Sequence, residues 1–129
     1  MRAIDTNVIV RFLTGDDPAQ TAKARKLIEG GEIFVSTTVL LETEWVLRSG
    51  YGFASERLVQ GLRDFAGLPG VTLEEPQLAA RALDWADQGL DFADALHLAG
   101  AQDCTVFMSF DRKLAKAAAR TSDVKVVLP

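Results

Sequence analysis

The sequence predicts an α/β fold, a mostly parallel central sheet sandwiched by helices on both faces. Short apolar segments alternate with longer segments whose apolar residues recur at helical spacing. Glycine and proline separate these segments, as at Gly30-Gly31 and in the run 67–70. The 129 residues, 48% of them hydrophobic, contain no repeat, low-complexity tract or linker. Length and continuity therefore predict one domain over residues 1–129.

The N-terminal half begins with a short strand, Arg2–Ile4, expected to be buried. Apolar residues at helical spacing predict a helix over Thr6–Leu13, which Gly15 ends. A proline at the first helical position predicts the next helix, Pro18–Glu29. The elements expected after it are a strand at Ile33–Val35, an apolar helix at Thr37–Arg48 closed by Gly50, and an amphipathic helix at Ser55–Phe65 closed by Gly67.

The C-terminal half continues the alternation of strands and helices. The expected elements are strand Val71–Leu73, helices Pro76–Asp87 and Phe92–Ala101, strand Thr105–Met108, helix Arg112–Ala119 and strand Val124–Val127. In such folds ligands bind beyond the carboxyl ends of the strands, near a topological switch point. Residues that directly follow strands are therefore the first candidates for a site.

Composition excludes several classes of protein. The single cysteine, Cys104, rules out an internal disulfide framework, and the single histidine, His97, argues against a zinc site of the usual kind. No apolar run approaches the roughly 18 residues of a membrane span, and no leader segment is recognisable, so a soluble cytoplasmic protein is expected. The net charge of −4 argues against a general nucleic-acid coat protein but leaves a nucleic-acid enzyme open.

Two aspartates follow predicted strands. Asp5 comes after the first strand, and Asp111 comes shortly after Thr105–Met108. Each alone is better explained as an N-cap that satisfies free backbone N–H groups. Together they indicate two acids that converge on one cleft.

Glu42 and Glu44 share one predicted helix but point to different faces. Glu44 has Arg48 four residues later, an order typical of a solvated ion pair. Glu42 has apolar helical neighbours and no cation, so burial of its carboxylate would require a partner such as a metal ion. Glu42 is therefore preferred to Glu44 as a site residue.

Asp91 and Asp94 flank the start of a predicted helix. Asp91 is the natural N-cap, which leaves Asp94 free to project into a cleft. His97, one turn later in an apolar helix, is interpreted as a core or rim residue.

Four close carboxylates repel one another unless a cation compensates them. Oxygen ligands without a Cys or His cluster select hard ions, Mg²⁺ or Mn²⁺. One or two such ions activate water and stabilise the leaving oxygen of a phosphodiester. Metal-dependent phosphate chemistry is therefore the leading class.

In four segments the chain resembles PIN-domain nucleases, in particular VapC-type toxins of bacterial toxin–antitoxin pairs. The segments are Ile-Asp-Thr-Asn-Val, Leu-Leu-Glu-Thr-Glu-Trp-Val-Leu, Phe-Ala-Asp-Ala-Leu-His-Leu-Ala and Ser-Phe-Asp-Arg-Lys-Leu-Ala, in the family's order and spacing. The resemblance implies a PIN-like fold and an endoribonuclease that depends on Mg²⁺ or Mn²⁺. It also implies a VapB-like antitoxin that occludes the pocket, a homodimer, and a hetero-oligomer with the antitoxin.

The same resemblance assigns roles to individual residues. Asp5 and Asp94 would be the principal metal ligands, with Glu42 and Asp111 in support, and Asp91 stays a second choice. Thr6 and Asn7 would order the water around the first acid. Separately, a basic stretch after Asp111 is a candidate RNA contact. Its residues are Arg112, Lys113, Lys116 and Arg120. A solvated surface helix explains the same charges equally well.

Other classes fit the sequence less well. A haloacid-dehalogenase-type phosphatase requires a second acid where Asn7 stands, and a receiver domain requires a phospho-acceptor that Val35-Ser36-Thr37 does not provide. The G-x-S-x-G, P-loop and dinucleotide fingerprints are absent. The alternative from another class is a catalytically silent PIN-fold module that binds RNA or protein. The presence of an acid at all four positions argues against it, because a silent module would have lost some of them.

Overall fold

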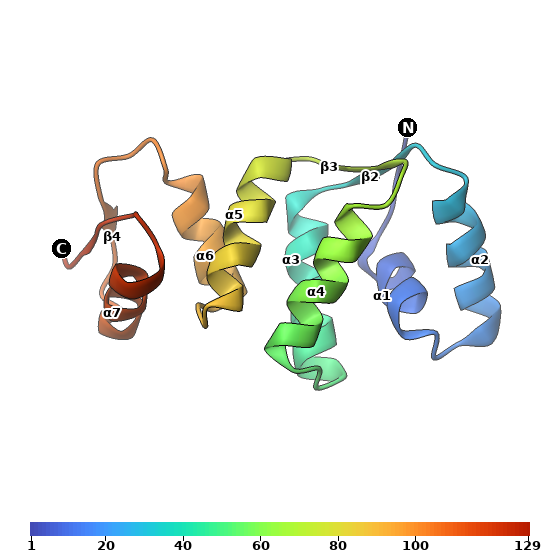
Figure 1. The fold of residues 1–129 in the computed structure, drawn as a ribbon, viewed down its shortest axis with the longest axis horizontal. Helices are drawn as coiled ribbons and strands as arrows, with labels where there is room; N and C mark the ends of the chain where they lie inside the picture. Colours follow the sequence, from blue (N-terminus) through green and yellow to red (C-terminus); the bar gives the residue numbers. More distant parts are fainter. The chain divides into compact units, whose positions relative to one another are not determined.

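The structure is a computed structural model that describes all residues, 1–129. The chain divides into two compact units, Met1–Pro76 and Gln77–Pro129, and each is described by itself (Figure 1). Every strand pair is parallel and helices separate the strands along the chain, which confirms the predicted α/β class.

The N-terminal unit contains a three-stranded parallel sheet in the order β1-β2-β3. In its register Arg2 lies opposite Ile33, and Ile33 lies opposite Val71. Its elements are β1 (Arg2–Ala3), α1 (Thr6–Thr14), α2 (Pro18–Glu29), β2 (Ile33–Val35), α3 (Thr37–Trp45), the π-helix η1 (Val46–Gly50), α4 (Ser55–Ala66) and β3 (Val71–Leu73).

Side-chain caps mark the starts of α2 and α3. Asp17 precedes Pro18 and accepts a hydrogen bond from the Gln20 amide at 3.1 Å, and Ser36 accepts one from the Val39 amide at 3.3 Å. These caps satisfy N–H groups that have no partner inside the helix. Helices α2 and α3 therefore begin at the residues predicted.

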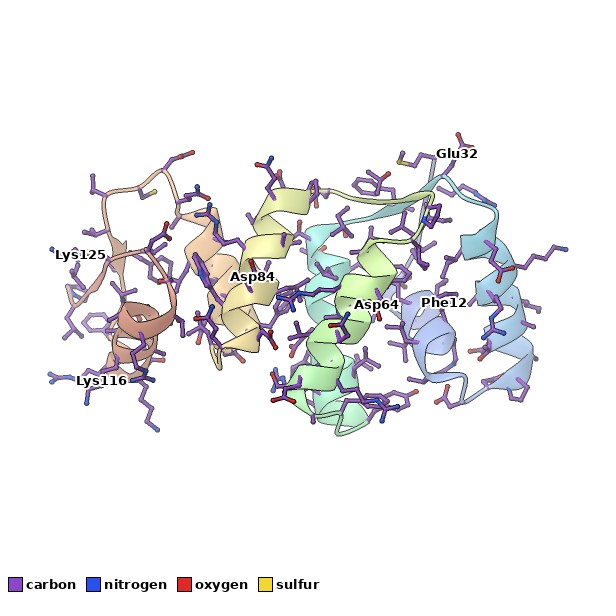
Figure 2. All side chains as sticks on the ribbon, viewed as in Figure 1. Phe12, Glu32, Asp64, Asp84, Lys116 and Lys125 are labelled. Atoms are coloured by element: carbon purple, nitrogen blue, oxygen red, sulfur yellow. The ribbon has the colours of Figure 1, made fainter.

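The core of the N-terminal unit joins the sheet to α1, α3 and α4. The rings of Phe12 in α1 and Phe65 in α4 pack edge to face with a centroid distance of 6.0 Å. Figure 2 labels Phe12. The largest fully buried side chains of this unit are Ile9, Ile33, Val35, Leu40, Leu62 and Phe65, with the buried hydroxyl residue Thr43 among them.

Two glycines allow the loops before β2 and β3 to approach each other. Gly70 has a φ of +82°, and a Cβ there would lie 2.6 Å from the Cα of Gly31. No side chain fits in that space, so this crossing requires glycine.

The C-terminal unit has a two-stranded parallel sheet in which Phe107 lies opposite Val126. Its elements are α5 (Pro76–Asp87), α6 (Phe92–Gly100), β4 (Phe107–Met108), α7 (Arg112–Thr121) and β5 (Val126–Val127). Arg81 lies over the Trp85 ring at 5.8 Å and forms an ion pair with Asp123 at 3.7 Å.

Three details correct the sequence-based expectations. The first strand is exposed and ends at Ala3, so only Ile4 of the predicted segment is buried. Strands β4 and β5 have two residues each, because pairing covers only part of the predicted segments. The helix predicted at Thr37–Arg48 is α-helical only to Trp45 and continues as η1.

Candidate active site

Asp5 stands between β1 and α1 and is the N-cap of α1. Its Oδ1 accepts a hydrogen bond from the Thr6 amide at 2.7 Å, and its Oδ2 accepts none. The residue is exposed. The N-cap explanation is therefore correct, but capping occupies only one carboxylate oxygen and leaves the other available to a ligand.

Thr6 joins the start of α1 to the middle of α3. Its hydroxyl is buried and donates a hydrogen bond to Oε1 of Glu42. This bond holds the Glu42 side chain toward the end of β1, where Asp5 lies. Two acids 37 positions apart are thus joined through one threonine.

These residues line one open pocket of about 380 Å³ in the N-terminal unit. Its polar members include Asn7, which is exposed and makes no side-chain hydrogen bond in the structure. The complete lining is Asp5, Thr6, Asn7, Val10, Arg11, Glu42, Val46 and Tyr51. Two carboxylates, a hydroxyl and an amide therefore face the same space.

The burial argument for Glu42 is wrong. Glu42 is exposed, whereas Glu44 is buried with 6% exposure and forms an ion pair with Arg48 at 3.0 Å. The buried stripe of this helix contains two polar residues, Thr43 and Glu44, so hydrophobicity does not reveal which face packs inward. What favours Glu42 is its place in the pocket with Asp5.

Sequence reasoning missed two pocket residues, Arg11 and Tyr51. Arg11 lies four residues after Asn7 and so shares its helix face, a signal that was available in the sequence. Tyr51 gave no such signal. Its amide donates to the Val46 carbonyl at 3.3 Å, the five-residue bond of the π-helix, and this altered turn sets where the ring lies.

In the C-terminal unit Asp91 caps α6 and Asp94 lies in its first turn. The Asp94 amide donates to Oδ2 of Asp91 at 3.1 Å, as the sequence predicts. The Asp94 carboxylate is half-buried and makes no hydrogen bond or ion pair in the structure. His97 is exposed, so the prediction of a core location is wrong, and a place at the rim of the site stays a prediction.

The electrostatic environment of Asp94 disfavours its charged form. Burial raises the pKa of the Asp94 carboxyl above its usual 3.8, and the nearby charges of Asp91 and Asp111 raise it further. His97 acts in the opposite direction. The charges of Asp91 and Asp111 are therefore close enough to Asp94 to repel its carboxylate.

Asp111 precedes α7 and is its N-cap. Its Oδ1 accepts hydrogen bonds from the amides of Lys113 and Leu114, both at 3.0 Å, and its Oδ2 accepts none. The hydroxyl of Ser109 accepts from the Asp111 amide at 3.0 Å and fixes the turn. As with Asp5, one carboxylate oxygen stays free.

Helix α7 presents only positive charge. Its cations are exposed and form no ion pairs in the structure, and Lys116 projects into solvent (Figure 2). They are Arg112, Lys113, Lys116 and Arg120. The helix is therefore a solvated surface with cations free to meet a polyanion.

Comparison of the sequence with models of known protein families identifies the family of this chain. The family model described as the PIN domain matches residues 3–120, which is most of the chain and runs across both units. The chain belongs to the PIN domain family. No curated protein and no solved structure matches it.

Membership of the PIN domain family indicates the general class of activity. PIN domains are in general nucleases, that is, hydrolases whose substrate is nucleic acid, and they typically use divalent metal ions. No helix of this PIN domain is long and apolar enough to cross a membrane.

The residues present fit such a metal ion. Within either unit no three His, Cys, Asp or Glu side chains gather closely enough to hold a metal by themselves. Mg²⁺, however, is commonly bound by one or two carboxylates together with waters and substrate phosphates. Carboxylate oxygens are the hard ligands that this ion prefers. The N-terminal unit carries two such candidate groups, Asp5 and Glu42, and the C-terminal unit carries two, Asp94 and Asp111.

Proposed function

We propose that the chain is an Mg²⁺- or Mn²⁺-dependent endoribonuclease, the VapC-type toxin of a VapBC pair. One observation carries the metal dependence. Asp94 is a half-buried carboxylate without a hydrogen bond or ion pair, and burial together with the charges of two nearby acids raises its pKa. A bound cation would remove this unfavourable interaction. The protein is a single PIN-like domain over residues 1–129, which a family match across both units supports.

In this proposal Asp5 and Asp94 are the principal metal ligands, and Glu42 and Asp111 support them. Thr6 holds Glu42 in place by its hydrogen bond, and the free amide of Asn7 orders water. When bound, the metal ion activates a water molecule and offsets negative charge on the scissile phosphodiester. Asp91 acts through α6, because its side chain bonds the backbone amide of Asp94.

The substrate is RNA, with the cations of α7 in contact with its backbone. Phe110, directly before Asp111, is 81% exposed. An exposed aromatic ring beside free cations is typical of surfaces that bind single strands. The proposal also includes a VapB-like antitoxin that covers the pocket, a homodimer, a hetero-oligomer with the antitoxin, and a cytoplasmic location.

The alternative is a catalytically silent PIN-fold module that binds RNA or protein. All four acidic positions are filled, and each of these side chains has an oxygen that no internal hydrogen bond uses. A silent module would have no need of uncompensated acids. The nuclease is therefore preferred.

The deciding experiment is cleavage of a mixed RNA pool with Mn²⁺, with EDTA, and by Asp94→Asn. Asp103→Asn is the matched control, since Asp103 is an exposed acid of the same unit. We expect the wild type and Asp103→Asn to cut RNA only with Mn²⁺, and Asp94→Asn not to cut. Cleavage of a single-stranded DNA pool under the same conditions tests whether the substrate is RNA rather than DNA.

Wild-type protein that binds RNA but cuts neither pool with Mn²⁺ would support the silent module. Equal cutting by Asp94→Asn and the wild type would contradict the assignment of Asp94.

A further inference from the structure

Arg11 is a cation held in a fixed position within the acidic pocket of the N-terminal unit. Its Nε donates to Oε1 of Gln20 at 2.7 Å. Its Nη1 donates to Oδ1 of Asp16 at 3.2 Å and to the Tyr51 hydroxyl at 3.1 Å. Three partners from different segments therefore orient one guanidinium group.

Tyr51 is itself held in place. Its hydroxyl donates to Oδ2 of Asp16 while it accepts from Arg11. Its ring stacks on the Phe53 ring at a centroid distance of 6.0 Å and an interplanar angle of 13°, and Arg57 lies over Phe53 at 5.6 Å. Contacts at both the ring and the hydroxyl leave Tyr51 little freedom to move.

The second terminal nitrogen of Arg11, Nη2, makes no hydrogen bond in the structure. Arg11 lines the same pocket as Asp5 and Glu42 but forms no ion pair with either. The ion partner of Arg11 is Asp16, which lies outside the pocket lining, so Arg11 is not paired with the pocket acids. Its free N–H groups are available to a ligand.

An RNA phosphate is the ligand that such a group fits. The free Nη2 of the guanidinium can donate a charge-assisted hydrogen bond to a phosphate oxygen, and such bonds are about twice as strong as those between neutral groups. A pocket that holds carboxylates and one oriented arginine suits a phosphate that meets metal ion and cation together. A carboxylate and a phosphodiester each carry one negative charge, and the phosphodiester is the one that the proposed nuclease function supplies to this pocket.

We propose that Arg11 is a catalytic residue that binds a non-bridging oxygen of the scissile RNA phosphate, and that Tyr51 is a positioning residue for it. This inference rests on the proposed nuclease function. Arg11 donates to the phosphate through Nη2 and offsets the charge that develops as the phosphodiester is attacked. Gln20, Asp16 and Tyr51 orient the group before substrate arrives, so little side-chain entropy is lost on binding.

The test uses the full chain with Arg11→Ala, Arg11→Lys, Tyr51→Phe and the control Arg25→Ala. Arg25 is an exposed arginine of α2 outside the pocket. Single-turnover cleavage of an RNA oligonucleotide is measured with Mn²⁺. Affinity for the same oligonucleotide is measured with Ca²⁺ in place of Mn²⁺ over a range of salt concentrations. Melting temperatures establish that each variant is folded.

We expect Arg11→Ala to cut about 10²–10³-fold more slowly, as for loss of one oriented donor. The slope of log affinity against log salt should fall by about 0.7, one single-strand phosphate contact. Arg11→Lys should keep the slope and recover only part of the rate, since it keeps the charge and loses the planar group that Gln20, Asp16 and Tyr51 orient. Tyr51→Phe should slow cleavage about 3–10-fold with the slope unchanged, and Arg25→Ala should match the wild type.

The result that overturns the proposal is a folded Arg11→Ala variant with the wild-type cleavage rate and salt slope. Failure of the nuclease proposal looks different, because the wild type itself then does not cut. In that case an unchanged slope in Arg11→Ala still overturns the phosphate contact, and a reduced slope supports it.

Discussion

Removal of the Asp94 charge should change the stability of the protein in opposite directions with and without metal. Asp94→Asn keeps the shape of the side chain and removes a negative charge near Asp91 and Asp111. Two unit charges 4 Å apart in water repel by about 1 kcal/mol, and the repulsion falls with distance, so Asp91 and Asp111 together repel Asp94 by less than about 2 kcal/mol. Asp94 also interacts favourably with the start of α6, worth about 0.3–1 kcal/mol.

These terms leave a modest net gain for the metal-free variant. Asp94 is only half-buried, so solvent screens its repulsion, and we expect Asp94→Asn to gain about 0.5–1 kcal/mol. That corresponds to a rise in melting temperature of about 2–5 °C. With metal at about 100 times its Kd, the wild type gains about 2.7 kcal/mol that the variant does not. The order of melting temperatures should therefore reverse.

The assay is thermal unfolding of the wild type, Asp94→Asn and Asp103→Asn, each in EDTA and in Mn²⁺. Asp103→Asn should follow the wild type in both buffers. The reasoning is refuted if Asp94→Asn melts below the wild type in EDTA, or if Mn²⁺ raises the melting temperature of both by the same amount.

The raised pKa of Asp94 also predicts a pH dependence. Between the usual carboxyl value of 3.8 and the raised pKa of the folded state, the folded protein binds more protons at Asp94 than the unfolded chain does. The contribution of Asp94 to metal-free stability therefore falls as pH rises through this window. Comparison of unfolding free energies of the wild type and Asp94→Asn in EDTA measures it. A difference that does not vary with pH would contradict the shift.

Three further predictions test other parts of the structure. Thr6→Val removes the hydroxyl that holds Glu42 and should weaken Mn²⁺ binding about 10–100-fold by calorimetry, whereas Thr6→Ser should not. Reversal of charge at Lys116 and Arg120 should lower RNA affinity and reduce its salt slope by about 1.4, whereas reversal at Arg25 and Lys26 of α2 should leave the slope unchanged. Gly70→Ala should cost about 2–3 kcal/mol in urea unfolding, because its φ is +82° and its Cβ would meet Gly31, whereas Gly61→Ala meets no atom within 4 Å and should not destabilise.

Local chemistry made part of the site predictable from sequence. Asp5, Asp91 and Asp111 are N-caps in the structure, and each was placed at the start of a helix from its neighbours alone. Capping depends on residues within one turn, so sequence determines it. The same locality made Asp94 recognisable, since Asp91 already supplies the cap of α6. The repeated strand–helix alternation and the parallel pairing followed from the apolar pattern.

What sequence could not determine depends on packing between distant segments. The inward face of α3 carries Glu44 and not Glu42, because the sheet and neighbouring helices select the buried face of a helix that has apolar residues on several sides. The position of Tyr51 depends on a π-helical turn, and the orientation of Arg11 depends on partners from three segments. The sequence by itself thus determined the α/β class, the caps and the acidic chemistry. Only the tertiary structure decided which glutamate is buried and which cation lines the pocket, because burial and long-range hydrogen bonds arise only once the chain has folded.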